Sequence, residues 1–458
     1  KLSGTYKKRK YRVQYGESDF AFLSRMLEDA GITFYFEQAG DETKLVLSDA
    51  PQTNELRAEK IAFREGHLSS FDREYVTAVR IGRQVRAGRY TMRDHDYRKP
   101  AEYELQATVE DGSDLEQNLE RFHYTPGAFL FGTDKGPSTP VADDRGKTRS
   151  DEGEAKLIAQ KRLEARRGSA WTCTFETNVI DLSPGMVLSL LDHPRSELGP
   201  GEKLLVLEST LSGNIDSLTH AVEVKSASSP YRPPLRTPKP KAMGVESATV
   251  VGPKGEEIHT DEFGRVRCHF HWDRQSKMDE KSSCWIHVSQ SWAGAGYGTT
   301  HLPRIGQEVL VDFLGADPDR PVIVGRVYTD LEKTPYKLPE HKTQTGWKSN
   351  STGKTGGYNE IMFEDQGGKE LVRMQAEKDL TKLVKHDESI TIGNDRSKSV
   401  GHDDSLTVGN DRSRMVGNNE SVTVGSDQTI TVGANQTVTV GVDQTETISG
   451  NRTFSLTG

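Results

Sequence analysis

Two cysteines and three histidines lie close together in the sequence and could bind a metal ion. Cys268, His269 and His271 precede Cys284 and His287, and cysteine and histidine are the usual ligands of zinc. In an extended strand, however, alternate residues face opposite sides, so the cysteines face away from His269 and His271. The C-x-x-C spacing of a structural zinc site is also absent. We therefore expect these residues to form the wall and surface of a β-barrel, and we predict no metal or cofactor.

A second candidate is a phosphate-binding loop. Gly353-Lys354-Thr355 is similar to the end of such a loop, but Lys348 occupies the place of its first glycine and no apolar strand leads into it. The sequence shows no GxSxG elbow, no HExxH helix and no credible pairing of a nucleophile with a base. Paired acids such as Asp403 and Asp404 lie in a polar repeat, where we expect them to be solvated. We predict that the chain is not an enzyme.

Composition and charge limit the class of protein. A chain of 458 residues has room for about three domains. With 33% hydrophobic and 28% charged residues it is polar for a globular protein, yet it is too rich in strand-like and aromatic segments to be disordered. Its net charge of −8 gives no general attraction to phosphate backbones, so we do not expect a nucleic-acid partner.

Cysteine usage and the start of the chain bear on its location. The 3 cysteines are odd in number and sparse, which favours a reducing compartment. There is no run of roughly 18 apolar residues and no secretory signal at the start. We therefore expect assembly in the cytoplasm; if the protein leaves the cell, something other than its own signal must take it out. The chain opens without a methionine, close to the strand-like segment 11–15, so we expect part of its N-terminal domain to be missing.

Helix and strand patterns divide the chain into domains. Helices are predicted over 18–30, with Ser18 as N-cap and Gly31 as its end, and over 152–167. Strand-like runs dominate the rest of the region up to residue 228, and five prolines follow within 229–241. The predicted domains are an α+β domain at 1–228, a proline-rich linker at 229–241, a small barrel of about five strands at 242–330, a second linker at 331–358 and a repeat domain at 359–458.

The C-terminal region repeats every eight residues. Each repeat ends in glycine directly preceded by Ile or Val, with a second apolar residue two positions earlier. Both side chains face one side of a strand, and an even period keeps that side in every copy. Lys398, Arg414 and Glu446 interrupt the second position. We predict an inward-facing core of Ile390, Ile392, Val400, Leu406, Val408, Val416, Val422, Val424, Ile430, Val432, Val438, Val440 and Ile448. The predicted turns are at Gly393, Gly401, Gly409, Gly417, Gly425, Gly433 and Gly441.

One octad cannot hold its own shape. Burying two such side chains contributes about 3–6 kcal/mol, whereas ordering eight residues costs about 8–16 kcal/mol of backbone entropy. Ladder hydrogen bonds between stacked copies must supply the difference. Three chains that each contribute one octad to every layer would close a ring and give a long, stiff needle. The polar residues, chiefly Asp, Asn, Gln and Thr, are expected on its outer face.

Two other interpretations of the repeat remain. A single chain that coils three octads per turn would also close, as a solenoid or adhesin-like stalk, but it would be short. A calcium-binding repeat would account for the aspartates beside the glycines, but it should have a period of nine with paired glycines, and neither is present.

The order of these segments and their motifs resembles one family, the VgrG spike proteins of type VI secretion systems, which are similar to the hub and needle proteins of contractile phage tails. The resemblance covers nearly the whole chain. Residues 11–36 resemble the hub, and 359–365 resemble the entry to the needle. The motifs similar to the family's OB-fold are HTDEFGRVRCHFHW (259–272), SQSWAG (289–294), PRIGQEV (303–309) and DPDRP (317–321).

The resemblance implies a mainly β fold with a partial phage-hub-like barrel, an OB-fold barrel and a triple-stranded β-helix needle formed by a homotrimer. It also implies a non-enzymatic spike mounted on an Hcp tube and tipped by a PAAR-repeat protein. Such a spike carries effector and adaptor proteins, and crosses a target membrane without residing in it. The alternatives are the tail spike of a contractile phage or phage-like particle, and a cell-wall hydrolase, which would need a helical insertion that the sequence lacks.

Overall fold

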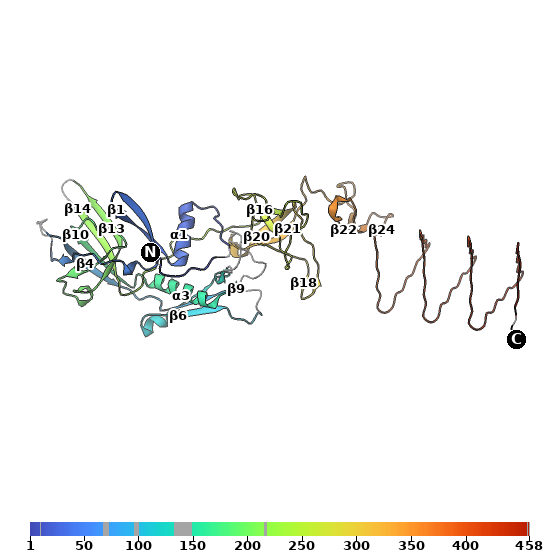
Figure 1. Cartoon of the computed structure of the whole chain (residues 1–458), viewed down its shortest axis with the longest axis horizontal. Coiled ribbons are helices and arrows are strands. Elements are labelled where there is room, and N and C mark those ends of the chain that lie inside the picture. Colours follow the sequence, from blue (N-terminus) through green and yellow to red (C-terminus); the bar gives the residue numbers. More distant parts are fainter. Residues whose placement is uncertain are drawn as a thin grey trace. The chain divides into compact units, whose positions relative to one another are not determined.

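The computed structural model describes residues 1–9, 11–66, 73–95, 100–131, 149–214, 218–455 and 457. Two compact units make up the chain, residues 1–379 and residues 380–458 (Figure 1). Among the described residues, every helix and strand lies in the first unit. The mainly β fold expected from the sequence is confirmed.

Helix α1 (Asp19–Ala30) begins and ends where the sequence predicts. The Ser18 hydroxyl accepts a hydrogen bond from the Ala21 N–H at 3.2 Å, which satisfies one free donor of the first turn. Gly31 ends the helix with φ 72°, a left-handed conformation that is strained for other residues. The hairpin that follows consists of β1 (Thr33–Ala39) and β2 (Glu42–Ser48).

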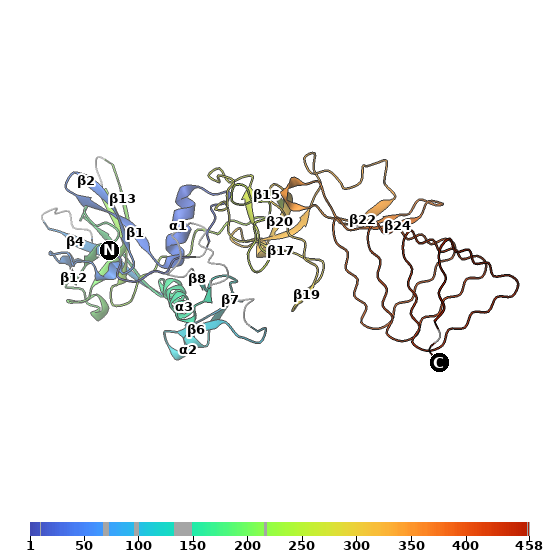
Figure 2. The same cartoon turned by 45° about the vertical axis from the view of Figure 1, so that its right-hand side comes forward.

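A seven-stranded sheet forms the main core of the N-terminal region. Its order is β11-β13-β14-β10-β4-β3-β12. The first and last strands in this order are separated by Ser189 alone, so the sheet curls round into a nearly closed barrel (Figure 2). Its strands are β3 (Ile61–Phe63), β4 (Tyr75–Arg83), β10 (Trp171–Thr177), β11 (Val187–Leu188), β12 (Leu190–Leu191), β13 (Leu204–Gly213) and β14 (Leu218–Ser226).

A smaller layer packs helix α3 (Glu152–Arg167) against a three-stranded sheet of order β6-β5-β7. Ile158 and Leu163 of the helix are buried against Tyr90 and Met92 of β5. The bounds are β5 (Arg89–Arg93), β6 (Gln106–Glu110), β7 (Glu120–Tyr124), α2 (Asp114–Gln117), β8 (Leu130–Phe131) and β9 (Arg149–Ser150).

The next five strands form the small barrel predicted from the sequence. Their order is β16-β15-β20-β21-β17, and a bridge between Val266 and Ile286 joins the two end strands. Cys268 and Phe270 lie in its apolar core. The strands are β15 (Glu246–Val251), β16 (Arg267–Phe270), β17 (His287–Val288), β20 (Glu308–Phe313) and β21 (Pro321–Arg326), with a side hairpin of β18 (Ala293–Gly294) and β19 (Tyr297–Gly298).

A three-stranded sheet ends the first unit. It comprises β22 (Gln344–Lys348), β23 (Glu360–Glu364) and β24 (Leu371–Gln375), in that order. Strand β22 lies in the predicted linker 331–358, so the sheet extends across the predicted boundary at 359. The short 3₁₀ helices are η1 (Pro51–Thr53), η2 (Ser196–Leu198), η3 (Leu314–Ala316) and η4 (Thr352–Lys354).

The segment 11–15 differs from the sequence expectation. It forms no strand, because its aromatic side chains pack on the small barrel. The Tyr15 hydroxyl donates to Glu246 at 2.5 Å, and the ring of Tyr15 meets Trp272 edge-on at 5.3 Å. The N-terminal segment is therefore part of the contact between the hub-like region and the barrel. None of the described helices is both long and apolar enough to cross a bilayer.

Candidate functional site

The tail, residues 380–458, is an open coil with a bend every eight residues. The bends fall on each repeat glycine and the residue after it, as at Gly393–Asn394 and Gly401–His402. Between bends the chain is extended, but among the described residues no segment of the tail pairs with another. A Cβ added at any of the seven repeat glycines would meet nothing within 4 Å. The tail therefore has no interior of its own.

Side-chain exposure shows which way the repeat faces. Numbering each octad so that the glycine is position eight, the residue at position seven is 44–50% exposed from Ile392 to Ile448. Apolar residues at positions six and one are far more open: Met415 is 94% and Val442 is 90% exposed. The aliphatic residues at position five are 58–68% exposed, between these two groups, and by alternation they share the side of position seven, here named the inner side. The aliphatic residues predicted for the core all occupy these two positions.

Polar residues at position three also face inward, which corrects the expectation of a wholly outer polar face. Glu388 and Glu420 have side chains 42% and 39% exposed, whereas their outward neighbours at position two, Asp387 and Asp403, are 88% and 89% exposed. Alternation explains this placement, because positions three, five and seven lie on one face of an extended segment. Our sequence analysis used alternation only for the apolar pair and missed the third member.

The repeat also begins earlier than its glycines indicate. Bends fall at 385–386 and 377–378, one and two octads before Gly393 respectively. Val384 then occupies position seven and is 41% exposed, like the later members. Lys385 replaces glycine there, which is why a search for glycine overlooked this octad. The apolar residue eight positions before Ile392 was the signal that could have found it.

An extended coil without partners leaves its backbone hydrogen bonds unmade. N–H and C=O groups that are shielded from water must be paired, and exposed aliphatic side chains on one continuous face are an unfilled core. Among the described residues, the tail therefore has neither a strand partner nor an opposing apolar face.

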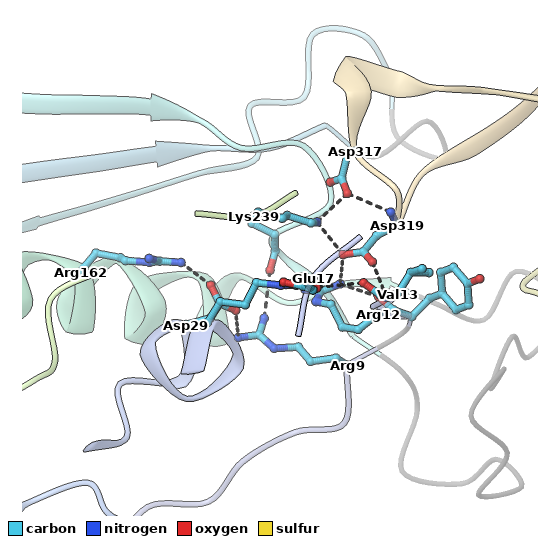
Figure 3. A network of polar contacts seen from close by, with 12 residues as sticks. Arg9, Arg12, Val13, Glu17, Asp29, Arg162, Lys239, Asp317 and Asp319 are labelled. Carbon is cyan, nitrogen blue, oxygen red and sulfur yellow. Dashed lines mark hydrogen bonds and ion pairs between the residues drawn. The ribbon is translucent and has the colours of Figure 1, made fainter. Parts of the chain in front are cut away.

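A second site connects the hub-like region to the small barrel within residues 1–379. Asp319, on the loop between β20 and β21, has a side chain only 4% exposed. It accepts hydrogen bonds from the Val13 N–H at 2.8 Å and from Lys239 Nζ at 2.5 Å (Figure 3). Arg12 lies at 3.6 Å from the same carboxylate. One carboxylate therefore holds three separate stretches of chain together.

Val13 extends this junction to helix α1. Its C=O accepts a hydrogen bond from Arg25 at 2.8 Å, while its N–H is bound to Asp319. Arg25 is itself buried and forms an ion pair with Glu17 at 2.6 Å. A single peptide segment is thus fixed on one side by the helix and on the other by the barrel loop.

Asp29 anchors the other end of α1. It forms ion pairs with Arg9 at 3.0 Å and with Arg162 of α3 (Figure 3). Burial alone would raise the pKa of Asp29, but the nearby guanidinium groups, above all that of Arg162, outweigh it and hold the pKa below its usual value. The carboxylate is therefore ionised over the physiological range and joins the N-terminal segment to both helices.

The proline-rich stretch 229–241 is held along this junction. Lys239 bridges Asp317 and Asp319, each at 2.5 Å. Arg232 pairs with Glu164 of α3 at 2.9 Å, and Glu28 of α1 accepts the Thr237 N–H at 2.9 Å. The stretch is therefore a bound connection between hub and barrel, not a free tether.

The candidate metal ligands are divided between two environments. Cys268 and Cys284 are buried in the barrel core, where burial raises the pKa of the Cys268 thiol. His269 and His271 share the other face with ring centroids 5.8 Å apart, and His271 bonds Glu308 at 3.0 Å. Within the described ranges, no three His, Cys, Asp or Glu side chains are placed to hold a metal ion.

The glycine-lysine-threonine segment does not form a phosphate loop. Lys354 ends the 3₁₀ helix η4, and the Gly353 N–H donates to the Glu257 carboxylate at 3.0 Å. An acid bound to this backbone amide disfavours an anion there. A Ser–His pair missed by sequence reasoning, Ser209 and His220 at 2.6 Å, is likewise unsuited to catalysis, because His220 is buried at 1% exposure and its other nitrogen contacts the Val179 C=O.

Three family models match the chain, in the order of the structural regions. The phage tail baseplate hub (GPD) matches residues 1–216. The type VI secretion system/phage-baseplate injector OB domain matches residues 254–328. The bacteriophage T4 gp5 C-terminal trimerisation domain matches residues 345–456, which includes β22–β24 and the octads.

Relatives with curated names agree with this order. The type VI secretion system spike protein VgrG4b of Pseudomonas aeruginosa is 34% identical over 415 residues, covering 86% of this chain and 49% of the relative. VgrG1a of the same bacterium is 35% identical over 407 residues, covering 86% and 60%. The chain belongs to the VgrG family of spike proteins. It spans about half the length of the first of these relatives.

Other matches extend the comparison. The actin cross-linking toxin VgrG1 of Vibrio cholerae is 33% identical over 392 residues, which cover 83% of this chain but 34% of the toxin. Among solved structures, the E. coli c3393 protein, described as a type VI secretion component similar to T4 tail proteins gp27 and gp5, is 18% identical. Its TM-score is 0.45, and the match covers 71% of this chain and 65% of that one.

Proposed function

We propose that this chain forms the homotrimeric, membrane-puncturing spike of a type VI secretion system. In this proposal the spike is mounted on an Hcp tube, carries a PAAR-repeat tip protein and effectors with their adaptors, and is injected into the target cell without a signal peptide. It passes through the target membrane and does not remain there. The proposal rests on membership of the VgrG family and on the three matched domains.

The observation that carries the proposal is that the described tail encloses no apolar core of its own. Its inner side repeats every eight residues over 378–457, while no described segment of it pairs with another in the same chain. Threefold association would pair each extended octad on both edges and bury the inner side. A closed needle of this kind has no free lateral strand edge, which suits a rod that must cross a membrane intact.

The junction at Asp319 supports a mechanical role. A rod that is pushed from its base must carry compression from hub to needle without bending at the domain boundary. Buried ion pairs with good geometry resist separation, because breaking one leaves an unpaired charge in a shielded place. The bonds of Asp319, Val13 and Lys239 occupy that boundary.

A test of the trimer uses two valines on either side of one bend. Val440 lies on the inner side at 46% exposure, whereas Val442 is 90% exposed. Val440→Asp would place three carboxylates in the needle core, so we expect it to abolish or sharply weaken the trimer. Val442→Asp should leave it unchanged. Light scattering of the full chain over a concentration series gives the mass, which should correspond to three chains for the unsubstituted protein.

A monomer in that measurement would contradict the proposal and favour a solitary solenoid. Equal effects of the two valine substitutions would contradict the assignment of the inner side.

The non-enzymatic part of the proposal rests on what the described residues contain. The Ser209–His220 pair is buried, and the GxSxG and HExxH motifs of hydrolases are absent from the sequence. The toxin of Vibrio cholerae shows that relatives can be named for an enzymatic activity, but this chain matches 34% of its length. We expect purified protein to show no cell-wall hydrolase activity in a turbidity assay.

The alternative is a spike of a contractile phage or phage-like particle. The hub and trimerisation models are named for phage proteins, which is the observation in its favour. The VgrG relatives, at 34% and 35% identity, favour the secretion system. Genes for a contractile sheath and secretion membrane complex beside this one would support the secretion system, and phage capsid genes would support the alternative.

A further inference from the structure

The tail has a second period, of two octads, in its charges. Position three carries Glu388, Arg396, Asp404, Arg412 and Glu420 in successive octads, so its sign alternates without a break. The acidic side chains of this set are 39–57% exposed, against 88% and 89% for Asp387 and Asp403 at position two, and alternation places all five on the inner side. The octads are therefore of two kinds, acidic and basic at position three, that follow each other in turn.

Position five follows the same double period. The octads that are basic at position three also carry a base at position five, as at Lys398 and Arg414, while the acidic octads carry an aliphatic residue there. Each base forms an ion pair across the next bend, six residues ahead: Lys398 with Asp404 at 2.6 Å, and Arg414 with Glu420 at 2.5 Å. Lys382 pairs with Glu388 in the same way. In the part of the chain that the structure describes, no ion pair involves Arg396 or Arg412.

Threefold symmetry fixes which octads can lie side by side. If every bend carries a chain to the next face of a three-sided needle, a given chain returns to a face after three octads. On that face, the two strands between two successive octads of one chain come from the other two chains. Each octad then lies between the preceding octad of one neighbour and the following octad of the other, an arrangement called here the one-octad stagger.

The alternation of charge suits this arrangement and disfavours an unstaggered or a two-octad arrangement. In the one-octad stagger Arg396 lies between Glu388 of one chain and Asp404 of another, and Arg412 between Asp404 and Glu420. Stacking without a stagger, or with a stagger of two octads, would place like charges beside each other on the inner side. Charges that are shielded from water repel strongly, and directly opposed like charges destabilise paired strands.

We propose that the alternating charges at position three select further copies of this chain in the one-octad stagger. The proposal rests on the trimeric needle and adds its register. A strict eight-residue repeat would otherwise allow chains to slip by whole octads without moving any apolar side chain off the inner side, because register is weakly specified where the pattern repeats. Internal polar residues fix register in other multi-chain assemblies at a cost in stability.

The octads after Glu420 have no alternating charge that could fix the register. Position three is Gln428 and then Gln436, and position five is Ile430 and then Val438. A slip by one octad in this stretch would replace a glutamine by a glutamine at position three and an aliphatic residue by an aliphatic residue at position five. The register of this stretch must therefore be set by the charged octads before it, and a probe placed here reads the register without disturbing the charges.

Cysteine cross-linking tests the stagger directly. Thr431 and Thr439 occupy position six of successive distal octads and face outward by alternation. In the one-octad stagger, Thr431 of one chain lies beside Thr439 of a neighbour at the spacing of adjacent strands, about 4.8 Å, which a disulfide can span. Oxidation of the full chain carrying Thr431→Cys and Thr439→Cys should give covalent trimers on a denaturing gel, and either substitution alone should give none.

The native cysteines offer a low background, because Cys173, Cys268 and Cys284 are buried. They are controlled for by oxidising the chain without added cysteines and by blocking free thiols before denaturation. A chain with one added cysteine can form at most a covalent dimer. Covalent dimers from either single substitution would therefore show that equal octads lie side by side and would overturn the proposal.

Reversal of the charges tests their role in that register. Arg396→Glu with Arg412→Glu would leave five acids in a row at position three, so the yield of covalent trimer should fall by more than half. The matched control reverses two outward charges, Asp387→Lys with Asp403→Lys, and should retain the full yield. An unchanged yield in the arginine variant would overturn the proposal.

The mass of each variant keeps the two proposals apart. Light scattering that shows a trimer without the cross-link from the paired threonines would contradict the stagger and leave the trimeric spike intact. A monomeric unsubstituted chain would contradict both.

Discussion

At the scale of single residues, Asp319 is the point where the hub-like region and the barrel meet. Its carboxylate holds Val13 and Lys239, and it is almost wholly buried. Removing its carboxylate would leave the Val13 N–H without an acceptor, which costs about 1–3 kcal/mol. Lys239 is 39% exposed and would keep Asp317 as a partner, so its charge adds little to this cost. We therefore expect Asp319 to contribute more to the stability of the first unit than an exposed loop residue does.

We therefore expect Asp319→Ala to destabilise the first unit by about 1–3 kcal/mol. The matched control is Asp330→Ala, since Asp330 is fully exposed and pairs only with exposed Lys333. Denaturant unfolding followed by tryptophan fluorescence gives the free energy of the first unit alone, because every tryptophan lies there. These are Trp171, Trp272, Trp285, Trp292 and Trp347. Equal midpoints for the two variants would contradict this role for Asp319.

Asp29 predicts how the junction responds to acid. Its pKa in the folded chain is below the value of about 3.9 expected when unfolded, so the unfolded state binds a proton more readily. Its contribution to stability is present above about pH 4 and is lost as pH falls from there through the folded pKa. Unfolding midpoints at pH 7 and pH 3 should differ less in Asp29→Asn than in the unsubstituted chain. An equal loss in both would show that other groups govern the acid response.

At the scale of elements, local signals in the sequence sufficed for the helices. Ser18 and Gly31 bound α1 as predicted, and α3 has the predicted limits 152–167. We expect Ser18→Ala to cost about 0.5–2 kcal/mol in the same fluorescence measurement, because one N–H of the first turn would lose its acceptor. Thr53→Ala, which removes an exposed hydroxyl at the end of a 3₁₀ helix, is the control and should cost less.

Long-range contacts could not be predicted from the sequence. Tyr11 and Tyr15 have the alternation of a strand, yet they pack on the barrel through Trp272 and Glu246, more than 200 residues away in the chain. The prolines of 229–241 indicated an extended linker at a domain boundary, but they gave no sign that Lys239 and Arg232 bind this linker to a loop and a helix. Neither contact leaves a periodic mark in the sequence, because each depends on tertiary neighbours.

The octads show the opposite case, in which the sequence was read too narrowly. Val384 has the right spacing but lacks the glycine, and Glu388 has the right parity but is charged. Both were overlooked because apolar residues and glycine were taken as the only members of the pattern. Parity alone, applied to every residue between two bends, would have placed positions three, five and seven on one side.

At the scale of the whole molecule, the two units differ in what they need to be folded. Residues 1–379 enclose three apolar cores of their own. Residues 380–458 enclose none among the described positions, and their structure depends on association. On dilution we therefore expect the tail to lose ordered structure as trimers dissociate, while tryptophan fluorescence of the first unit stays constant. Simultaneous loss of both signals would contradict this independence.

The missing interior of the tail has a consequence for how the protein is made. After synthesis, no described segment of the tail has a partner within the tail on which to pack. Before it associates with two further copies, the tail exposes unpaired strand edges and the apolar inner side to every other chain in the cell. Such exposure favours aggregation. Under this proposal, a working spike therefore requires one of two things: rapid association of newly made copies, or a chaperone that covers the inner side until they associate.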